Sequence, residues 1–327
     1  MDKRYNTLNV WLRNKFGEKV YKISMDAGFT CPNRDGKVST GGCIFCSERG
    51  SGDFAAAGSD LMEQFAKGKE MMEKKWKKGK YIAYLQAFTN TYAPVPKLRE
   101  IYTQLINAPG VVGLAIATRP DCLDDDVIKL LKELSSKMFL WIELGLQTAS
   151  DETADIINRG YKTETYLKAM KKLNAAGIPV VTHIIFGLPG ENRDLTMETV
   201  KLVANSGSWG VKLHMLHVLK NTKLEKMYLN GEVPVFEMQE YVEQIVDALE
   251  ILPPEMVIHR VTGDGGRDSL VAPLWSLKKF EVLNAIDEEF VKRSSCQGCL
   301  YKKIDGGIKC FQNYSVIKGL NRFQPRS

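Results

Sequence analysis

The segment 31–46, CPNRDGKVSTGGCIFC, constrains this chain more than any other stretch. It places three cysteines in the spacing C-x11-C-x2-C, directly after a β-like run at 20–25. Three thiolates in one loop can hold three irons of a [4Fe–4S] cluster and leave the fourth iron open to a ligand. A zinc site that lacks its fourth ligand and three plain thiols are the alternative interpretations. The third cysteine and the glycines Gly36, Gly41 and Gly42, which let the loop fold back, favour the cluster.

Length and cysteine usage fit this interpretation. The 327 residues allow two domains, or one α/β barrel with an extension. No apolar run reaches the ~18–20 residues that span a membrane, and the charged N-terminus has no apolar signal-peptide core. We therefore expect a cytoplasmic protein, without membrane contacts, in a compartment where disulfides are rare. Six of the seven cysteines form two groups, 31/43/46 and 296/299/310, which predicts metal ligands; Cys122 stands alone.

The charge of the chain is mildly basic, with a formal net charge of +6. Basic residues concentrate at 67–80, KGKEMMEKKWKKGK, and in the tail at Lys318, Arg322 and Arg326. Such a run is either a solvated helix face or a contact for nucleic acid. RNA is therefore a compatible partner that the charge alone does not require.

Apolar runs alternate with helix-like segments along most of the chain. Strands are expected at 20–25, 81–88, 111–117, 139–146, 179–186, 211–219 and 255–261. Helices are expected at 5–18, 59–78, 97–107, 124–135, 194–206, 237–252 and 276–291, with one or two more within 151–176. A strand every ~30–40 residues indicates βα units around a parallel sheet, and continuous apolar runs are typical of strands covered on both faces. The predicted fold class is α/β, a full or partial TIM-type barrel.

Polar or glycine-rich segments follow the predicted strands at one end. In α/β barrels the carboxyl ends of the strands meet on one rim, and catalysis takes place there. The gathering of such groups on one rim predicts an enzyme. The segments are the cysteine loop, Thr89-Asn90-Thr91, Thr118-Arg119, Gln147, the loop 187–191 and the glycine loop at Asp264.

Together these motifs resemble the radical S-adenosylmethionine (SAM) superfamily, whose members carry a three-cysteine loop after the first strand of a partial (β/α)6 barrel. The usual spacing there is C-x3-C-x2-C, and the longer first gap of this chain is similar to that of the Elongator catalytic subunit. A bacterial family known as YhcC/YtqA is more similar still, over roughly residues 5–290. Elongator-like segments are ATRPD at 117–121, ELGLQ at 143–147, NRG at 158–160 and THIIFGLP at 182–189. YhcC/YtqA-like segments are DAGFTCPNRDG at 26–36, QAFTNTYAP at 86–94, HRVTGDG at 259–265 and APLW at 272–275.

The resemblance implies that Cys31, Cys43 and Cys46 hold a [4Fe–4S] cluster whose open iron binds SAM. One electron then cleaves SAM to methionine and a 5′-deoxyadenosyl radical, which abstracts hydrogen from the substrate. A flavodoxin-type reductase is implied as electron donor. The segment after the second predicted strand, Thr89-Asn90-Thr91, lacks the Gly-Gly-Glu sequence that is common in the family. His183 can also be interpreted as a core histidine. The implied SAM-contacting positions are Thr89, Asn90, Thr91, Gln147, Arg159, His183, Gly187 and Glu191.

The resemblance also implies a substrate. Both related families point to uridine in tRNA, and the YtqA branch to the conversion of wobble carboxymethylaminomethyl-uridine toward aminomethyl-uridine. Two alternatives stay open. One is a radical SAM enzyme that acts on a small molecule or a peptide, and the other is a non-catalytic iron–sulfur or zinc protein that binds RNA.

Several candidates lie outside these motifs. We expect residues 1–255 to form the core barrel with its N-terminal helix, and residues 256–327 a C-terminal extension with a cysteine-rich tail. The tail cysteines predict a second metal site, zinc or another cluster, although no histidine completes a zinc set. His214 and His217 lie three apart on a predicted strand, so we expect one to face inward and one outward. The tail cysteines are Cys296, Cys299 and Cys310, and the glycine loop adds Asp264 and Arg267 as substrate contacts or turn residues.

Overall fold

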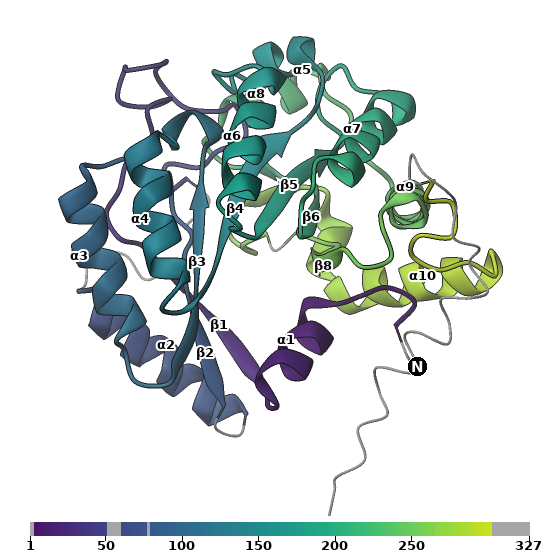
Figure 1. Ribbon diagram of the computed structural model, residues 1–327. Coiled ribbons are helices and arrows are strands. Elements are labelled where there is room, and N and C mark those ends of the chain that lie inside the picture. The colour runs from purple at the N-terminus through teal and green to yellow at the C-terminus, as the bar shows by residue number, and fades with distance from the viewer. Residues whose placement is uncertain (1–2, 51–59, 77–78, 264, 303–327) are drawn as a thin grey trace, which may run out of the picture.

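A seven-stranded parallel sheet forms the centre of the molecule in this computed structural model, which describes residues 3–50, 60–76, 79–263 and 265–302. The strand order is β1-β2-β3-β4-β5-β6-β8, and the sheet curls into an open half-barrel (Figure 1). The predicted α/β fold with a partial TIM-type barrel is confirmed. The strands are β1 (Val20–Met25), β2 (Lys80–Leu85), β3 (Val111–Thr118), β4 (Phe139–Gln147), β5 (Val180–Phe186), β6 (Gly210–Met215) and β8 (Val257–Arg260).

Helices cover the outer face of this sheet (Figure 1). The apolar faces of these helices and the outward side chains of the strands form one large core, in which Leu85, Leu144 and Phe186 are fully buried. The sequence did not predict α8 (Lys223–Leu229) or β9 (Leu270–Ala272). The predicted strand 211–219 is divided into β6 and β7 (Val218–Leu219), and β7 pairs with β9 in antiparallel orientation. The remaining helices are α2 (Leu61–Lys75), α3 (Val95–Ile106), α4 (Asp125–Ser135), α5 (Asp151–Ile156), α6 (Thr163–Ala175), α7 (Arg193–Asn205), α9 (Met238–Ile251) and α10 (Lys279–Lys292), with short turns η1 (Pro120–Cys122) and η2 (Leu274–Leu277).

The first helix, α1 (Leu8–Phe16), contacts both β1 and β8, the two edge strands of the half-barrel. Thr7 caps it by accepting a hydrogen bond from the backbone N–H of Val10, and Gly17 ends it in the left-handed conformation. Leu12 of α1 packs with Ile82 and other inward side chains of the sheet. The helix therefore seals the amino end of the barrel interior.

The inner face of the sheet changes from apolar to polar along the strands. Successive side chains of a strand alternate between its two faces, so Trp141, Glu143, Gly145 and Gln147 share the inner face of β4. Trp141 belongs to the apolar cluster beside α1, whereas Glu143 and Gln147 line a cavity at the carboxyl ends of the strands. The polar half of the interior is therefore the half that opens to substrates.

The C-terminal segment packs back onto the core. Helix α10 lies against α9, and the backbone N–H of Gln297 donates to the carbonyl oxygen of Arg4. Strand β8, which lies beyond the predicted boundary at 255/256, pairs in parallel with β6 in the main sheet. The division of the chain into core and extension stays a prediction. Within the described residues, none of the helices combines the length and the apolar character needed to cross a bilayer.

Candidate active site

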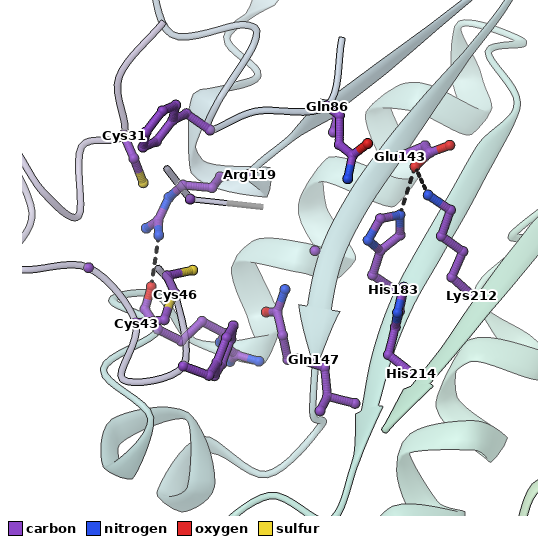
Figure 2. A pocket seen from close by; sticks show the side chains of 18 of the residues that line it. Cys31, Cys43, Cys46, Gln86, Arg119, Glu143, Gln147, His183, Lys212 and His214 are labelled. Carbon is purple, nitrogen blue, oxygen red and sulfur yellow. Dashed lines mark hydrogen bonds and ion pairs between the residues drawn. The ribbon is translucent and has the colours of Figure 1, made fainter. Parts of the chain in front are cut away.

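The cavity at the carboxyl ends of the strands has a volume of about 300 Å³, within the usual range of small-molecule sites. We call it the strand-end pocket. Figure 2 shows Cys31, Cys43 and Cys46 on one side of it and Glu143 and His183 across from them. The two walls come from different parts of the chain, the cysteine loop and the inner face of the sheet. The pocket thus places soft sulfur ligands opposite a charged polar wall.

The cysteine loop folds back on itself through backbone hydrogen bonds and glycines. The N–H of Cys46 donates to the carbonyl of Cys43 at 3.1 Å, which brings these two thiols together. Gly42 has a φ of +76°, and a Cβ there would come within 2.9 Å of the Arg34 side chain. The loop glycine is therefore required both by its backbone conformation and by the close approach of Arg34.

A distant segment, 157–160, braces the cysteine loop. Asn33 Nδ2 donates to the carbonyl of Asn158 at 2.6 Å, and Asn158 Nδ2 donates to the carbonyl of Gly42 at 2.8 Å. Gly160 has a φ of +79°, and a Cβ there would meet Asn33 Oδ1 at 2.6 Å. The NRG motif at 158–160 thus holds the cysteine loop in place, a role that the sequence did not reveal.

The thiol arrangement fits the expected cluster better than a single metal ion. Within the described part of the chain, no three His, Cys, Asp or Glu side chains converge on one ion position. A [4Fe–4S] cluster takes each thiolate at a different iron, so its ligands need not converge. The Cys46 thiol lowers the pKa of Cys43, burial opposes this, and the positive charges of Arg119 and Arg34 also favour the thiolate. The same hydrogen bond to Cys43, together with burial, raises the pKa of Cys46 well above its ordinary value, so Cys43 is the more readily ionised thiol of this pair.

Arg159 reaches the pocket but directs its guanidinium into the protein. Its Nε donates to the carbonyl of Tyr161 at 2.9 Å, and Nη1 donates to the carbonyls of Leu146 and Thr148 at 2.7 and 2.6 Å. Nη2 contacts Asp151 and Thr163, both at 3.3 Å. All five N–H donors are thus used by protein acceptors. Arg159 orders the loop after β4, and its predicted contact with SAM stays untested.

We expect Arg159→Lys to lower the free energy of unfolding by about 2–4 kcal/mol, because an ammonium cannot reach all these buried acceptors. Chemical denaturation of the purified protein measures the effect. Arg99→Lys is the matched control, since Arg99 lies on the surface of α3 and pairs with the exposed Glu133. Equal stability of Arg159→Lys and the wild type would contradict the structural role.

Glu143 is the centre of the opposite wall, and its side chain is fully buried. Its Oε1 accepts from Lys22 Nζ at 3.0 Å and from Trp141 Nε1 at 3.2 Å. Its Oε2 accepts from His183 Nε2 at 3.0 Å and from Lys212 Nζ. Burial alone would raise the pKa of Glu143, but Lys212, Lys22 and His183 outweigh it and hold that pKa well below its ordinary value. The carboxylate is therefore ionised and its oxygens are fully occupied.

His183 is fixed in one tautomer by this carboxylate. Because Glu143 is ionised, Nε2 of His183 carries the proton and Nδ1 is left as an acceptor. Burial and the positive charge of Lys212 lower the pKa of His183 to about 4. The imidazole is therefore neutral at pH 7. His183 is hydrogen-bonded to Glu143 and lines the pocket, and its predicted contact with SAM stays a prediction.

The lowered pKa of His183 predicts a loss of stability in acid. The unfolded chain protonates this histidine near pH 6.5, whereas the folded protein does so only near pH 4. Between these values the unfolded state binds more protons, so lowering the pH from 7 to 5 should cost about 2 kcal/mol through His183 alone. Denaturation at both pH values should show a smaller pH-dependent loss for His183→Gln, and an unchanged loss would refute this assignment.

The predicted SAM-contacting segment after β2, Thr89-Asn90-Thr91, lies partly in the pocket wall and partly in the core. Thr89 lines the strand-end pocket. Asn90 is buried, and its Nδ2 donates to the carbonyls of Leu85, Ala87 and Ala117. Thr91 Oγ1 lies 2.6 Å from Thr118 Oγ1 and donates to the carbonyl of Cys122. Asn90 and Thr91 therefore brace β2 against β3 instead of lining this pocket.

Of the other residues predicted to contact SAM, some line the strand-end pocket and some do not. Gln147 lines the pocket, with a φ of +62° that turns the chain at the end of β4, and its Oε1 accepts from the hydroxyl of Tyr161 at 3.1 Å. Gly187 and Glu191 are not among the residues that line it. Gly187 packs against Phe236, and Glu191 is hydrogen-bonded to Thr148. The SAM contacts themselves stay predictions.

The prediction that His214 and His217 face opposite ways is wrong. Both line the strand-end pocket. Strand β6 ends at Met215, so the strand alternation that would separate the two histidines does not extend to His217. Of the glycine-loop candidates, Arg267 is exposed and does not line the pocket, and Asp264 lies outside the described residues.

The second predicted metal site is described only in part. Cys296 is buried and Cys299 is half-buried, with the N–H of Cys299 donating to the carbonyl of Cys296 at 3.2 Å. Cys310 lies outside the described residues, as do Lys77, Lys78 and the basic tail. In the basic segment, Lys67, Lys74 and Lys75 are exposed on or at the end of α2. The tail metal site stays a prediction.

Sequence reasoning missed the charged wall of the pocket. Glu143, Lys212, Tyr84 and Arg260 all line it, but each sits inside or at the end of an apolar run. One signal in the sequence could have revealed this wall. A charged residue within a strand that is otherwise apolar indicates a buried charge, and buried charges need partners. Glu143 and Lys212 satisfy that rule by pairing with each other.

Comparisons with known proteins cover most of the chain. The radical SAM superfamily model matches residues 33–203, which include two of the three loop cysteines, and the radical SAM C-terminal domain model matches residues 208–292. The uncharacterized protein YtqA of Bacillus subtilis is 50% identical over 305 residues, which are 93% of this chain and 95% of YtqA.

Two further comparisons concern the barrel. A protein of Methanocaldococcus jannaschii named tRNA uridine(34) acetyltransferase is 27% identical over 204 residues, 61% of this chain and 34% of that protein. The solved structure of the archaeal Methanocaldococcus infernus Elp3 superposes with a TM-score of 0.65 at 19% identity, covering 85% of this chain and 64% of the other. The structural likeness concerns the fold alone.

Proposed function

The chain belongs to the radical SAM superfamily, and we propose that it modifies the C5 side chain of a wobble uridine in tRNA. The proposed change takes carboxymethylaminomethyl-uridine toward aminomethyl-uridine. The observation that carries the proposal is the strand-end pocket, which joins Cys31, Cys43 and Cys46 to a polar wall.

A [4Fe–4S] cluster with SAM supplies a 5′-deoxyadenosyl radical when both are bound, given one electron from a flavodoxin-type reductase. The three cysteines would hold the cluster, and Gln147 and Thr89 line the space beside them. The chain's own residues position the reactants. Segment 157–160 fixes the cysteine loop, which would hold the cluster in a constant position relative to the sheet.

A tRNA substrate is supported by the relatives and by charge. The similarity to the protein named tRNA uridine(34) acetyltransferase covers 61% of this chain. The chain carries a net charge of +6, and Lys67, Lys74 and Lys75 project from α2 into solvent. A basic surface favours a polyanion such as tRNA.

Reconstitution tests the proposal. Protein purified without air, loaded with iron and sulfide and reduced with dithionite, should form 5′-deoxyadenosine from SAM. Formation should increase when tRNA carrying carboxymethylaminomethyl-uridine is added, and aminomethyl-uridine should appear in the digested tRNA. 5′-Deoxyadenosine without any change in that tRNA would leave the superfamily chemistry intact and refute the tRNA substrate.

A further inference from the structure

His183 presents one ring nitrogen to the strand-end pocket. Its Nε2 donates to Glu143 Oε2 at 3.0 Å, whereas its Nδ1 has no hydrogen-bond partner among the residues that the structure describes. The side chain is 22% exposed and lines the pocket. Because Nε2 carries the proton of the neutral ring, Nδ1 can only accept a hydrogen bond. A ligand that enters the pocket therefore meets an acceptor held in one orientation.

The groups behind the ring keep this acceptor in place. Glu143 accepts from Lys22 and Lys212 as well as from His183, so the carboxylate stays ionised and gives no proton to Nε2. The ring of His214 lies 5.5 Å from the ring of His183, and burial holds the pKa of His214 well below its ordinary value. Both histidines are therefore neutral at pH 7, and neither gives Nδ1 of His183 a proton to donate.

The space beside this acceptor is left open by a glycine. Gly145 is the register partner of His183 on β4, and it lines the pocket. A Cβ at Gly145 would come within 2.5 Å of Gln147 Nε2, so the amide group of Gln147 occupies that space. Gln147 Oε1 accepts from the Tyr161 hydroxyl, and in the described part of the chain its Nε2 makes no hydrogen bond. An open donor on β4 thus lies beside an open acceptor on β5.

A donor beside an acceptor matches one edge of uracil. Uracil presents N3–H between two carbonyl oxygens, whereas cytosine presents an unprotonated N3 beside an amino group. We propose that His183 Nδ1 accepts the N3–H of a uracil base and that Gln147 Nε2 donates to its neighbouring carbonyl. This pair selects uridine over cytidine. The proposal rests on the proposed function, because it assigns the residues that recognise the base of that substrate.

The same contacts would orient the reacting side chain. The C5 substituent of a uracil points away from N3, so a base whose N3 lies at His183 directs its C5 side chain away from the sheet wall. Figure 2 shows His183 across the pocket from Cys31, Cys43 and Cys46. The C5 side chain would therefore extend toward the thiols, where the cluster is expected.

The adenine of SAM is the other base that fits this pair, because its N6 amino group and N1 also place a donor beside an acceptor. The family chemistry binds SAM at the open iron, on the cysteine side of the pocket, whereas His183 belongs to the opposite wall. Equilibrium dialysis of SAM against the cluster-loaded protein separates the two occupants. His183→Gln should bind SAM as the wild type does, and weaker binding would assign His183 to adenine and overturn the proposal.

Calorimetric titration of the cluster-loaded protein with free nucleosides tests base selection without turnover. The wild type should bind 5-carboxymethylaminomethyl-uridine about tenfold or more tightly than the cytidine with the same side chain. His183→Gln keeps an amide N–H for Glu143 but has no acceptor at the Nδ1 position, so its affinity for the uridine should fall to that for the cytidine. Arg99→Gln, on the surface of α3, should keep the full preference.

His183→Asn separates the loss of this acceptor from general damage to the pocket. Its amide lies near the Nδ1 position and can present either oxygen or N–H, so this variant should bind both nucleosides with similar affinity. No uridine preference in the wild type, or a full preference in His183→Gln, would overturn the proposal. The proposed function is judged separately on tRNA, so a uridine preference that His183→Gln removes would support the base contact even if the tRNA were unchanged.

Discussion

Cys43→Ala is expected to leave the chain folded but to abolish both cluster binding and 5′-deoxyadenosine formation. Cys43 is one of three thiols on one wall of the strand-end pocket, and its pKa is lowered by the Cys46 thiol and by nearby arginines. Two thiolates cannot hold a cluster that already leaves one iron open. Iron content should fall by about four atoms per chain.

Iron and sulfide analysis, together with absorption spectra of protein purified without air, measures this effect. Cys122→Ala is the matched control, because Cys122 is also a half-buried free cysteine near the loop but is not on the pocket wall. That variant should keep its brown colour and its activity. Full cluster content in Cys43→Ala would contradict the assignment of the ligands.

Glu143→Gln should lower the free energy of unfolding by about 3–5 kcal/mol, because it leaves the ammonium groups of Lys22 and Lys212 without a buried counter-charge. Glutamine keeps the size of the side chain and most of its packing, so the decrease in the free energy of unfolding measures the effect of removing the charge. It also removes the ionised acceptor that orients His183. Activity with the tRNA substrate should therefore fall further than the change in stability explains.

Denaturation curves and 5′-deoxyadenosine assays at one temperature separate these two effects. Glu133→Gln is the control, since Glu133 contacts two cations, Arg99 at 2.7 Å and Lys137 at 3.1 Å, on the surface of the molecule. Exposed ion pairs contribute little, so this variant should unfold like the wild type. Equal behaviour of the two glutamate variants would contradict the central role of Glu143.

The strands could be predicted well from sequence because each is buried on both faces. Such strands leave continuous apolar runs, and β1 (Val20–Met25) was predicted with both of its bounds. Helix α8 and strand β9 were missed because they are short, with seven and three residues, and β7 was merged with β6 in the predicted strand 211–219. The cysteine loop was found from spacing alone, and all three of its thiols do line the pocket.

The charged wall could not be predicted in the same way, because it is made of contacts between residues far apart in the chain. Lys22 and Glu143 are separated by 121 positions. Asn90 and Arg159 illustrate the converse problem. Each matches a motif position, yet each donates hydrogen bonds to backbone carbonyl groups of the core, which spacing cannot reveal. Whether a polar side chain serves a ligand or the backbone depends on its partners.

Mass spectrometry of wobble nucleosides in tRNA from cells with and without this gene is the most direct test of the proposed function. The deletion should accumulate carboxymethylaminomethyl-uridine and lose aminomethyl-uridine and any nucleoside made from it. The wild-type gene should restore the profile, and the Cys43→Ala gene should not. A deletion strain whose wobble nucleosides match those of the parent would contradict the account.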